Sequence, residues 1–232
     1  MIHLAGEPVV PSSLAIRWSK AKKRRIYTSR VEGTTRLVEA LLTVKNPPQF
    51  FFSASAVAYY GSQGDTVVTE EVGKGEGFLS DVCAEWESAS SALKTRGVRV
   101  IHGRFGHVVD PDGGILKREL ALFKRGPAVQ FGDGGQWMSW IALSDLIEAI
   151  AVIILSKAID GPVNCTSPHP ITHRAWMQFV VKTAGRHAIW KIPEPLVRFL
   201  LGEMGEELFL SSIRAIPKKL IDSGFQFNKQ DL

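Results

Sequence analysis

Three hydroxyl-bearing side chains follow one buried segment of this sequence. Residues 49–57 form a continuous run of apolar and small residues, which is typical of a central strand in a parallel sheet. Ser55 lies at the end of this run, and Tyr59 and Tyr60 follow it. Open α/β sheets bind their ligands at the carboxyl ends of strands. We therefore expect Ser55 to face a ligand site that Tyr59 or Tyr60 can reach; the alternative is a strand-end serine bonded to backbone.

The motifs of the common nucleotide, nucleophile and metal sites are absent from the sequence. A dinucleotide site normally begins with a strand and a turn of the form GxGxxG or GxxGxxG, whose glycines let the backbone approach the pyrophosphate. Residues 73–77 and 132–135 are rich in glycine, but the first lacks a preceding strand and the second lies mid-chain, so we interpret both as loops. There is no Walker loop, GxSxG or HExxH. Pro170 separates His169 from His173, and we predict no metal site there.

The elements that must position these side chains alternate between strand and helix. Apolar runs predict strands over residues 1–5, 49–57 and 98–103, and helical periodicity predicts helices over 17–42 and 78–93. Such alternation favours right-handed crossovers and a parallel sheet with helices on its faces. After residue 104 the pattern becomes mixed. It predicts helices at 143–157, 172–183, 196–201 and 204–210, a strand at 162–166 and an extended segment at 225–227.

Composition and charge exclude several classes of protein. The chain has 232 residues, of which 45% are hydrophobic and 22% charged, so it is not disordered, collagen-like or a coiled coil. Its two cysteines form no disulfide framework, and we expect a cytoplasmic protein in a reducing compartment. Charged residues interrupt the longest apolar stretch, 141–159, so no membrane span is predicted. The net charge of +5 gathers over residues 17–36, which we interpret as a solvated helix face rather than a nucleic-acid site.

Several sequence strings occur in an order that resembles a known family. They are MIHLAGE, SRVEGTTRLVEAL, FFFSASAVAYYG, FLSDVCAEWESA, PDGGIL, GDGGQWMSWI followed by SDL, PVNCTSPHPIT, LLGEM and IPKKLIDSGFQF. Together they resemble the atypical extended short-chain dehydrogenase/reductases, the NAD-dependent epimerase/dehydratase-like proteins with a characteristic C-terminal domain. The resemblance covers almost the whole chain. It places residues 1–6 at the family's fourth strand, and the family's preceding segment with the Gly-rich fingerprint has no counterpart here.

The resemblance implies roles for individual residues. Ala5 and Gly6 match the turn that passes close to the cofactor ribose, although a tight turn alone would also explain Gly6. Ser55 matches a serine that binds the cofactor side and hydrogen-bonds a substrate carbonyl or hydroxyl group. A further loop of the family can line the substrate pocket, and a plain surface loop is the alternative here. The residues that match it are Asp133, Gly134, Gln136 and Trp137. NAD or NADP is the implied cofactor, and a small molecule is the implied substrate.

The usual proton relay of short-chain dehydrogenases is missing. That relay pairs a tyrosine with a lysine four residues later, whose charge lowers the phenol pKa. Leu79 and Cys83 stand where the pair is expected, and no tyrosine of the chain has a lysine at that spacing. Ser55 with Tyr59 or Tyr60 would therefore have to carry the proton. His107 and Asp110 also interrupt a strand extension that is usually apolar in this group.

The sequence thus predicts an α/β protein: the second half of a Rossmann-type, doubly wound parallel sheet with a small C-terminal domain on the substrate side. We assign residues 1–103 and 139–166 to the partial nucleotide-binding domain, and 104–138 and 167–232 to the C-terminal domain. The first functional hypothesis is an NAD(P)-linked oxidoreductase or epimerase-like enzyme that binds its cofactor weakly without the Gly-rich turn. The alternatives are a catalytically silent interaction module, a cell-division-related role included, or a truncated gene product. The uncovered edge of the sheet predicts a homo-oligomer.

Overall fold

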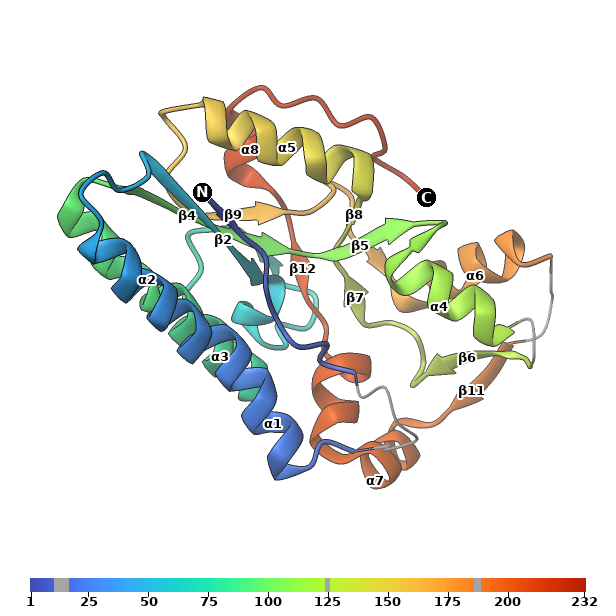
Figure 1. Ribbon diagram of the computed structural model, residues 1–232. Coiled ribbons are helices and arrows are strands. Elements are labelled where there is room, and N and C mark those ends of the chain that lie inside the picture. Colours follow the sequence, from blue (N-terminus) through green and yellow to red (C-terminus); the bar gives the residue numbers. More distant parts are fainter. Residues whose placement is uncertain (11–16, 124–125, 186–188) are drawn as a thin grey trace.

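A four-stranded parallel sheet forms the centre of the protein, in the order β1-β2-β4-β9. The computed structural model describes residues 1–10, 17–123, 126–185 and 189–232. The strands are β1 (Ile2–His3), β2 (Phe50–Ala56), β4 (Arg99–Phe105) and β9 (Gly161–Cys165), and Figure 1 shows them side by side between layers of helices. The predicted α/β fold with a Rossmann-type parallel sheet is confirmed.

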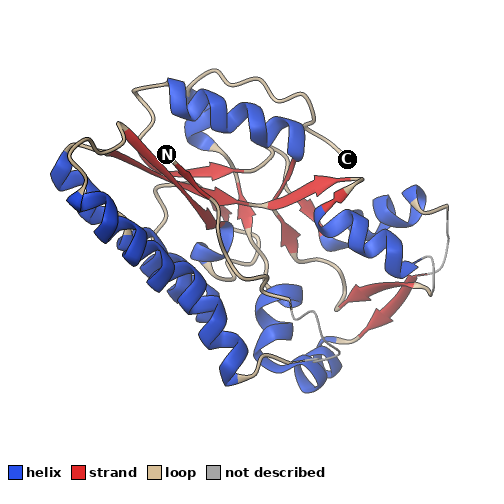
Figure 2. Cartoon of the chain, in the orientation of Figure 1, coloured by secondary structure: helices blue, strands red, loops and turns tan. Residues whose placement is uncertain are grey.

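Helices cover both faces of the sheet (Figure 2). On one face lie α1 (Lys20–Tyr27), α2 (Gly33–Thr43) and α3 (Phe78–Ala89). There Val38 packs with Phe51 and Val100, and Ile26 with Leu79. On the other face lie α5 (Leu143–Leu155) and α8 (Lys218–Asp222). Burial of these apolar side chains against the strands holds the two layers on the sheet.

A second group of elements packs beside the carboxyl end of the sheet. Its helices are α4 (Gly114–Phe123), α6 (His173–Thr183) and α7 (Glu194–Gly205). Four two-stranded pairs accompany them: β5 (His107–Asp110) with β8 (Trp140–Ala142), β6 (Ala128–Phe131) with β11 (Ile189–Ile192), β7 (Trp137–Met138) with β10 (Ile171–Thr172), and β3 (Val67–Val68) with β12 (Arg214–Ala215). Trp140 and Trp176 are buried in a core that α4 and α6 share with the strands packed on them.

Most predicted elements occur near their predicted bounds, with three differences. The predicted helix over 17–42 consists of α1 and α2 joined by a π-helical turn at Thr28–Glu32. Residues 204–210, predicted as a separate helix, continue α7 into the π-helical turn Glu206–Leu210 beyond a kink at Gly202, whose φ is 56°. The predicted helix over 78–93 ends at Ala89 and is followed by a 3₁₀ turn at Ser91–Arg96. Residues 225–227, predicted as extended, lie outside the helices and strands, and Phe227 lies in the core beneath α5, in the same cluster as Phe52.

The division into two domains stays a prediction. As predicted, β9 returns to the main sheet, where it pairs with β4. The C-terminal helix α8, which we assigned to the substrate-side domain, places Leu220 in the core formed by Phe52 and Ile101. The end of the chain is therefore packed on the sheet.

The basic segment at 17–36 is partly paired with acidic residues within the fold. Lys22 is only 5% exposed, and its Nζ lies 2.8 Å from Oε1 of Glu7. Lys23 contacts Glu203, and Arg24 contacts Glu32. These contacts tie α1 to neighbouring segments, so part of the segment is structural where we predicted a solvated face.

Candidate functional site

A buried ion pair lies at the carboxyl end of β2. Arg104 of β4 donates from Nε to Oε1 of Glu87 at 2.8 Å and from Nη2 to Oε2 at 2.9 Å. Ser55 is the register partner of Arg104 and donates to the same Oε1 at 2.7 Å. Burial alone would lower the pKa of Arg104, but the hydrogen bonds and negative charge of Glu87 raise it. The guanidinium therefore stays charged, and the Ser55 hydroxyl is held by a buried carboxylate.

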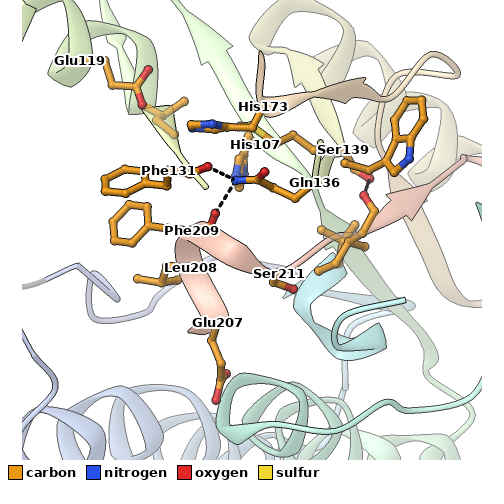
Figure 3. A pocket seen from close by; sticks show the side chains of 15 residues that line it. His107, Glu119, Phe131, Gln136, Ser139, His173, Glu207, Leu208, Phe209 and Ser211 are labelled. Atoms are coloured by element: carbon orange, nitrogen blue, oxygen red, sulfur yellow. Dashed lines mark hydrogen bonds between the residues drawn. The ribbon is translucent and has the colours of Figure 1, made fainter. Parts of the chain in front are cut away.

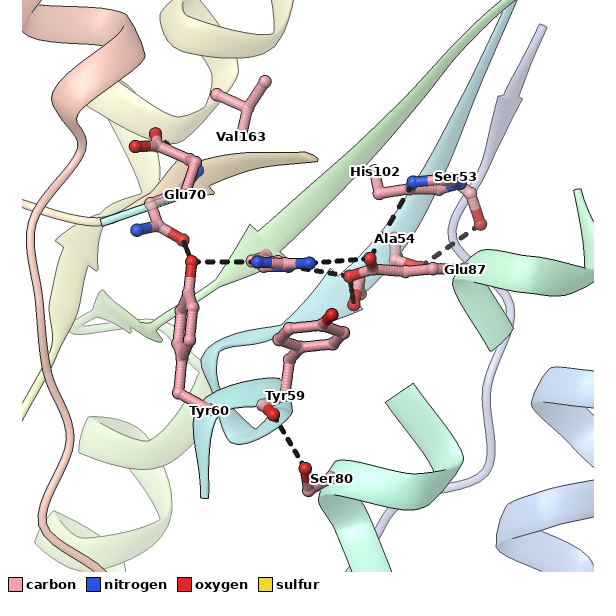
Figure 4. A network of polar contacts seen from close by, with 12 residues as sticks. Ser53, Ala54, Tyr59, Tyr60, Glu70, Ser80, Glu87, His102 and Val163 are labelled. Carbon is pink, nitrogen blue, oxygen red and sulfur yellow. Dashed lines mark hydrogen bonds and ion pairs between the residues drawn. The ribbon is translucent and has the colours of Figure 1, made fainter. Parts of the chain in front are cut away.

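Both tyrosines that follow β2 contact Arg104 of this ion pair (Figure 4). The Tyr60 hydroxyl accepts from Nη1 of Arg104 at 3.0 Å and donates to Oδ1 of Asn164 at 2.8 Å. Burial raises the pKa of Tyr60 to about 12, although Arg104 and Asn164 oppose the shift. The Tyr59 ring lies 3.5 Å from Cζ of Arg104 in a cation–π contact and is only partly buried. The network brings the three predicted hydroxyl groups together, with two of them bonded internally.

A wide cavity of about 620 Å³ lies beyond the end of β2, at the N-terminus of α3. Its walls include Ala58, Gly61 and Leu79. Gly75 belongs to the same wall, and a Cβ there would lie only 1.9 Å from the Tyr60 carbonyl oxygen, so only glycine fits. Four carboxylates also line the cavity: Glu76, Glu203, Glu206 and Glu207.

Glu207 caps helix α3 from a distant part of the chain. Its Oε1 accepts from the Phe78 backbone N–H and its Oε2 from the Leu79 N–H, both at 2.7 Å. A carboxylate at a helix N-terminus satisfies free donors and complements the helix dipole. Burial nevertheless raises the pKa of Glu207 above its usual value. The contact holds the π-helical turn Glu206–Leu210 against the N-terminus of α3.

A small pocket of about 90 Å³ adjoins the wide cavity, because Glu207, Ser211 and Ile213 line both (Figure 3). Phe131 and Phe209 form one wall, with ring centroids 4.4 Å apart. The small pocket therefore extends the ligand space from the sheet edge toward the second group of elements.

Besides Glu207, three titratable side chains line the small pocket. His107 and His173 each have a pKa lowered to about 4, by burial in both cases and, for His173, also by His107. Glu119 has a pKa raised to about 7 by burial, although its Oε2 accepts from Trp176 Nε1 at 2.7 Å. At neutral pH both imidazoles are thus uncharged. The Nδ1 atom of His173 is buried without a hydrogen-bond partner among the described residues.

The predicted substrate-binding residues divide between this pocket and the surface. Gln136 and Trp137 line the small pocket. Gln136 donates to the carbonyl oxygens of Phe131 and Phe209 at 3.1 and 2.7 Å and so joins two of its walls. The Asp133 carboxylate instead accepts from the Gly135 N–H within its own exposed turn and lines neither cavity.

The predicted cofactor-binding turn lies at the exposed end of β1. Ala5 and Gly6 are both exposed, and a Cβ on Gly6 would lie 3.1 Å from Cζ of Arg30. β1 and β2 are parallel neighbours, as predicted. Gly6 and Ser55 line neither the wide cavity nor the small pocket.

The residues that the structure describes contain no group of three or more metal-ligating side chains. His169 and His173 are directed to different partners, since His169 Nδ1 lies 3.0 Å from Asp231 while His173 lines the small pocket. No helix among the described residues is both long and apolar enough to cross a bilayer.

Comparison with known proteins decides the family. A sequence profile of the NAD dependent epimerase/dehydratase family matches residues 2–165. The chain belongs to this family. Residues 192–232 also match a domain of unknown function, DUF1731, which is the characteristic C-terminal segment that we expected.

Several relatives from this family cover most of the chain. The epimerase family protein YfhF of Bacillus subtilis is 32% identical over 232 residues, which are 100% of this chain and 74% of YfhF. The epimerase family protein Mb2239 of Mycobacterium bovis is 37% identical over 212 residues, 91% of this chain and 70% of that protein.

Solved structures of family members superpose on the fold. Human epimerase family protein SDR39U1 (isoform2), solved with NADPH, has a TM-score of 0.89 and 25% identity, over 99% of this chain and 77% of that one. A nucleoside-diphosphate sugar epimerase from Corynebacterium glutamicum has a TM-score of 0.76 and 31% identity, over 99% and 43% respectively. MoeE5, solved with UDP-glucuronic acid and NAD, shares the fold at a TM-score of 0.74 and 18% identity, over 98% of this chain and 73% of that one.

Sequence reasoning missed several residues of the site. Glu87, Arg104 and Asn164 form the polar network, and Glu119 and His173 line the small pocket. A charged residue in a sequence can be identified as buried only when its partner is known. Here Arg104 lies on β4 and its partner Glu87 on α3, so their spacing in the sequence does not reveal the pair. Only His107 gave a signal, as a titratable residue within an otherwise apolar strand extension.

Proposed function

We propose that this chain forms the nicotinamide-facing and substrate-facing part of an NAD(P)-dependent oxidoreductase that acts on a small carbonyl or hydroxyl compound. The observation that carries the proposal is the continuity of the two cavities. The wide cavity opens at the carboxyl end of β2, where doubly wound sheets bind their ligands, and the small pocket continues from it through the shared wall at Glu207 and Ser211. The NADPH in the structure of SDR39U1 supports the cofactor class.

The polar network suggests how the three predicted hydroxyl groups divide their work. The Ser55 and Tyr60 hydroxyls donate to Glu87 and Asn164, and a phenol of pKa about 12 is a poor base at neutral pH. In our proposal these two are positioning residues for Arg104. Tyr59 is stacked on that guanidinium and lines neither cavity, so it would have to turn toward the wide cavity to act as the proton donor.

In our proposal, these 232 residues contact only the nicotinamide half of NAD(P). No Gly-rich turn of the dinucleotide type occurs in the sequence, so the pyrophosphate and adenosine lack their usual anchor. Affinity of this chain for the whole dinucleotide should therefore be about millimolar or weaker. When bound, the nicotinamide ring supplies or accepts the hydride, and the chain orients it beside the substrate.

Saturation-transfer NMR of the purified chain with NADP⁺ tests this assignment, because it reports weak binding and resolves the two halves. We expect stronger saturation of the nicotinamide ring protons than of the adenine protons. Ala58→Leu, which places a larger apolar side chain in the wall of the wide cavity, should weaken the nicotinamide signal, whereas Ala40→Leu on the exposed side of α2 should leave it unchanged. Equal saturation of both rings, or none, would favour a catalytically silent interaction module.

A further inference from the structure

The walls of both cavities carry negative and uncharged groups only, among the residues that the structure describes. The wide cavity has four carboxylates, and the small pocket has Glu119 and Glu207. No lysine or arginine appears in either lining. Two cations that contact wall carboxylates are already paired: Lys23 Nζ lies 2.8 Å from Glu203, and Arg198 Nε lies 2.8 Å from Glu206. Arg214 stacks on Trp137, with its Cζ 4.1 Å from the ring centroid.

This charge pattern is unsuited to a nucleoside diphosphate. Phosphate and diphosphate groups are normally held by arginine, lysine or helix N-termini, which supply charge-assisted hydrogen bonds. Here the N-terminus of α3, which borders the wide cavity, already binds the Glu207 carboxylate through two backbone N–H groups. A diphosphate in the wide cavity would face that carboxylate and three others without compensation.

The small pocket, by contrast, suits an uncharged ligand with a ring. Phe131 and Phe209 offer ring faces, and the Phe131 ring lies 6.0 Å from that of His173. His173 is 7% exposed, and its partnerless Nδ1 atom is a buried polar group that a ligand oxygen or hydroxyl would satisfy. The low pKa values of His107 and His173, near 4, keep this wall uncharged at neutral pH.

We propose that the small pocket binds an uncharged carbonyl compound with an aromatic or alicyclic ring, and that neither cavity holds a nucleotide sugar. The ring would lie against Phe131 and Phe209, and the polar oxygen would be hydrogen-bonded by His173. This inference rests on the proposed function for its reaction, since the carbonyl carbon would be the hydride acceptor. Such a ligand differs in class from the nucleoside-diphosphate sugar after which the Corynebacterium glutamicum epimerase is named and from the UDP-glucuronic acid in the MoeE5 complex.

A pair of probes that differ in charge tests the proposal without any cofactor. Fluorine NMR line broadening would compare 4-fluoroacetophenone, which is uncharged, with 4-fluorobenzoate, which has the same ring and a carboxylate, at pH 8. We expect the ketone to bind at least about tenfold more tightly, because the pocket cannot neutralise a buried carboxylate. UDP-glucose, added in excess, should not displace the ketone. Equal or tighter binding of benzoate, displacement by UDP-glucose, or no binding of either probe would overturn the proposal.

A pair of variants tests whether the negative charge of the pocket wall sets the affinity for the two probes. Glu119→Gln removes a carboxylate from the wall and should raise the affinity for 4-fluorobenzoate several-fold while leaving the ketone nearly unchanged. Glu39→Gln, on the exposed side of α2, is the control and should change neither affinity. An unaltered benzoate affinity in Glu119→Gln would show that the probes bind elsewhere. Because no cofactor is present, loss of ketone binding would leave the nicotinamide assignment untouched.

Discussion

At the scale of single residues, the most consequential contact is the ion pair between Glu87 and Arg104. Both are buried, and Arg104 also holds Tyr60 by a hydrogen bond and Tyr59 by stacking. Removing one member of a buried pair leaves the other charge without compensation, at a typical cost of about 3–5 kcal/mol. The pair therefore orders the end of β2 and the two tyrosines that follow it.

Substitution of Glu87 should consequently cost far more stability than loss of an exposed pair. We expect Glu87→Leu to lower the free energy of unfolding by about 3–5 kcal/mol in urea titrations. The double variant with Arg104→Leu should lose less than the sum of the two single losses, because neither charge is then left alone. Asp222→Asn removes the exposed partner of Lys218 and should change stability by less than about 1 kcal/mol. Additive losses in the double variant would contradict the coupling.

His173 gives a second expectation at this scale, in the dependence of stability on pH. Its pKa is near 4 in the folded state and about 6.5 in an unfolded chain, so the unfolded state binds the proton first as pH falls. Its contribution to stability is complete above pH 6.5 and is lost as pH falls toward 4. The loss in the free energy of unfolding is about 2 kcal/mol at pH 5. His173→Gln should show a shallower loss between pH 6.5 and 4 in thermal unfolding. His169→Gln, at an exposed histidine, should retain the wild-type slope.

At the scale of elements, the strand and helix alternation was predictable because its signal is local. The apolar run before Ser55 marks β2, and Thr172 caps α6 by accepting from the Ala175 N–H at 3.2 Å. The pair of β3 and β12 joins residues far apart in the sequence through two residues per strand, so no local pattern reveals it. For the same reason the pocket assembled from Glu119, His173 and Phe209 could not be read from residue spacing.

The cap of α3 by Glu207 is another such long-range contact, and its removal should be measurable. Glu207→Ala leaves the Phe78 and Leu79 N–H groups without their acceptor and should destabilise the protein by about 1–2 kcal/mol. The neighbouring Glu206→Ala, which loses only an exposed contact with Arg198, should cost less than about 1 kcal/mol. Denaturant unfolding of both variants makes the comparison. Equal losses would mean that the cap contributes little.

At the scale of the whole molecule, β1 is the edge of the described sheet. It pairs with β2 on one side; its Ile2 side chain is 47% exposed, and Leu4, directly after the strand, is 55% exposed. An edge strand presents unpaired backbone groups, and exposed apolar side chains beside it favour pairing with another chain. The segment after β1 gives it partial protection, since Lys22 and Arg30 bind Glu7 and hold that segment against α1.

We therefore expect the purified 232-residue chain to associate through this edge as its concentration rises. Sedimentation velocity should show a mass that increases with concentration, and Leu4→Lys should shift the distribution toward the monomer, because a charge on an edge strand opposes strand pairing. Leu122→Lys is the matched control: Leu122 is 66% exposed on α4, away from the sheet edge, and its substitution should leave the association unchanged. Equal effects of the two substitutions would indicate non-specific apolar association. A monomer at all concentrations would mean that the contacts of Glu7 with α1 suffice to protect the edge.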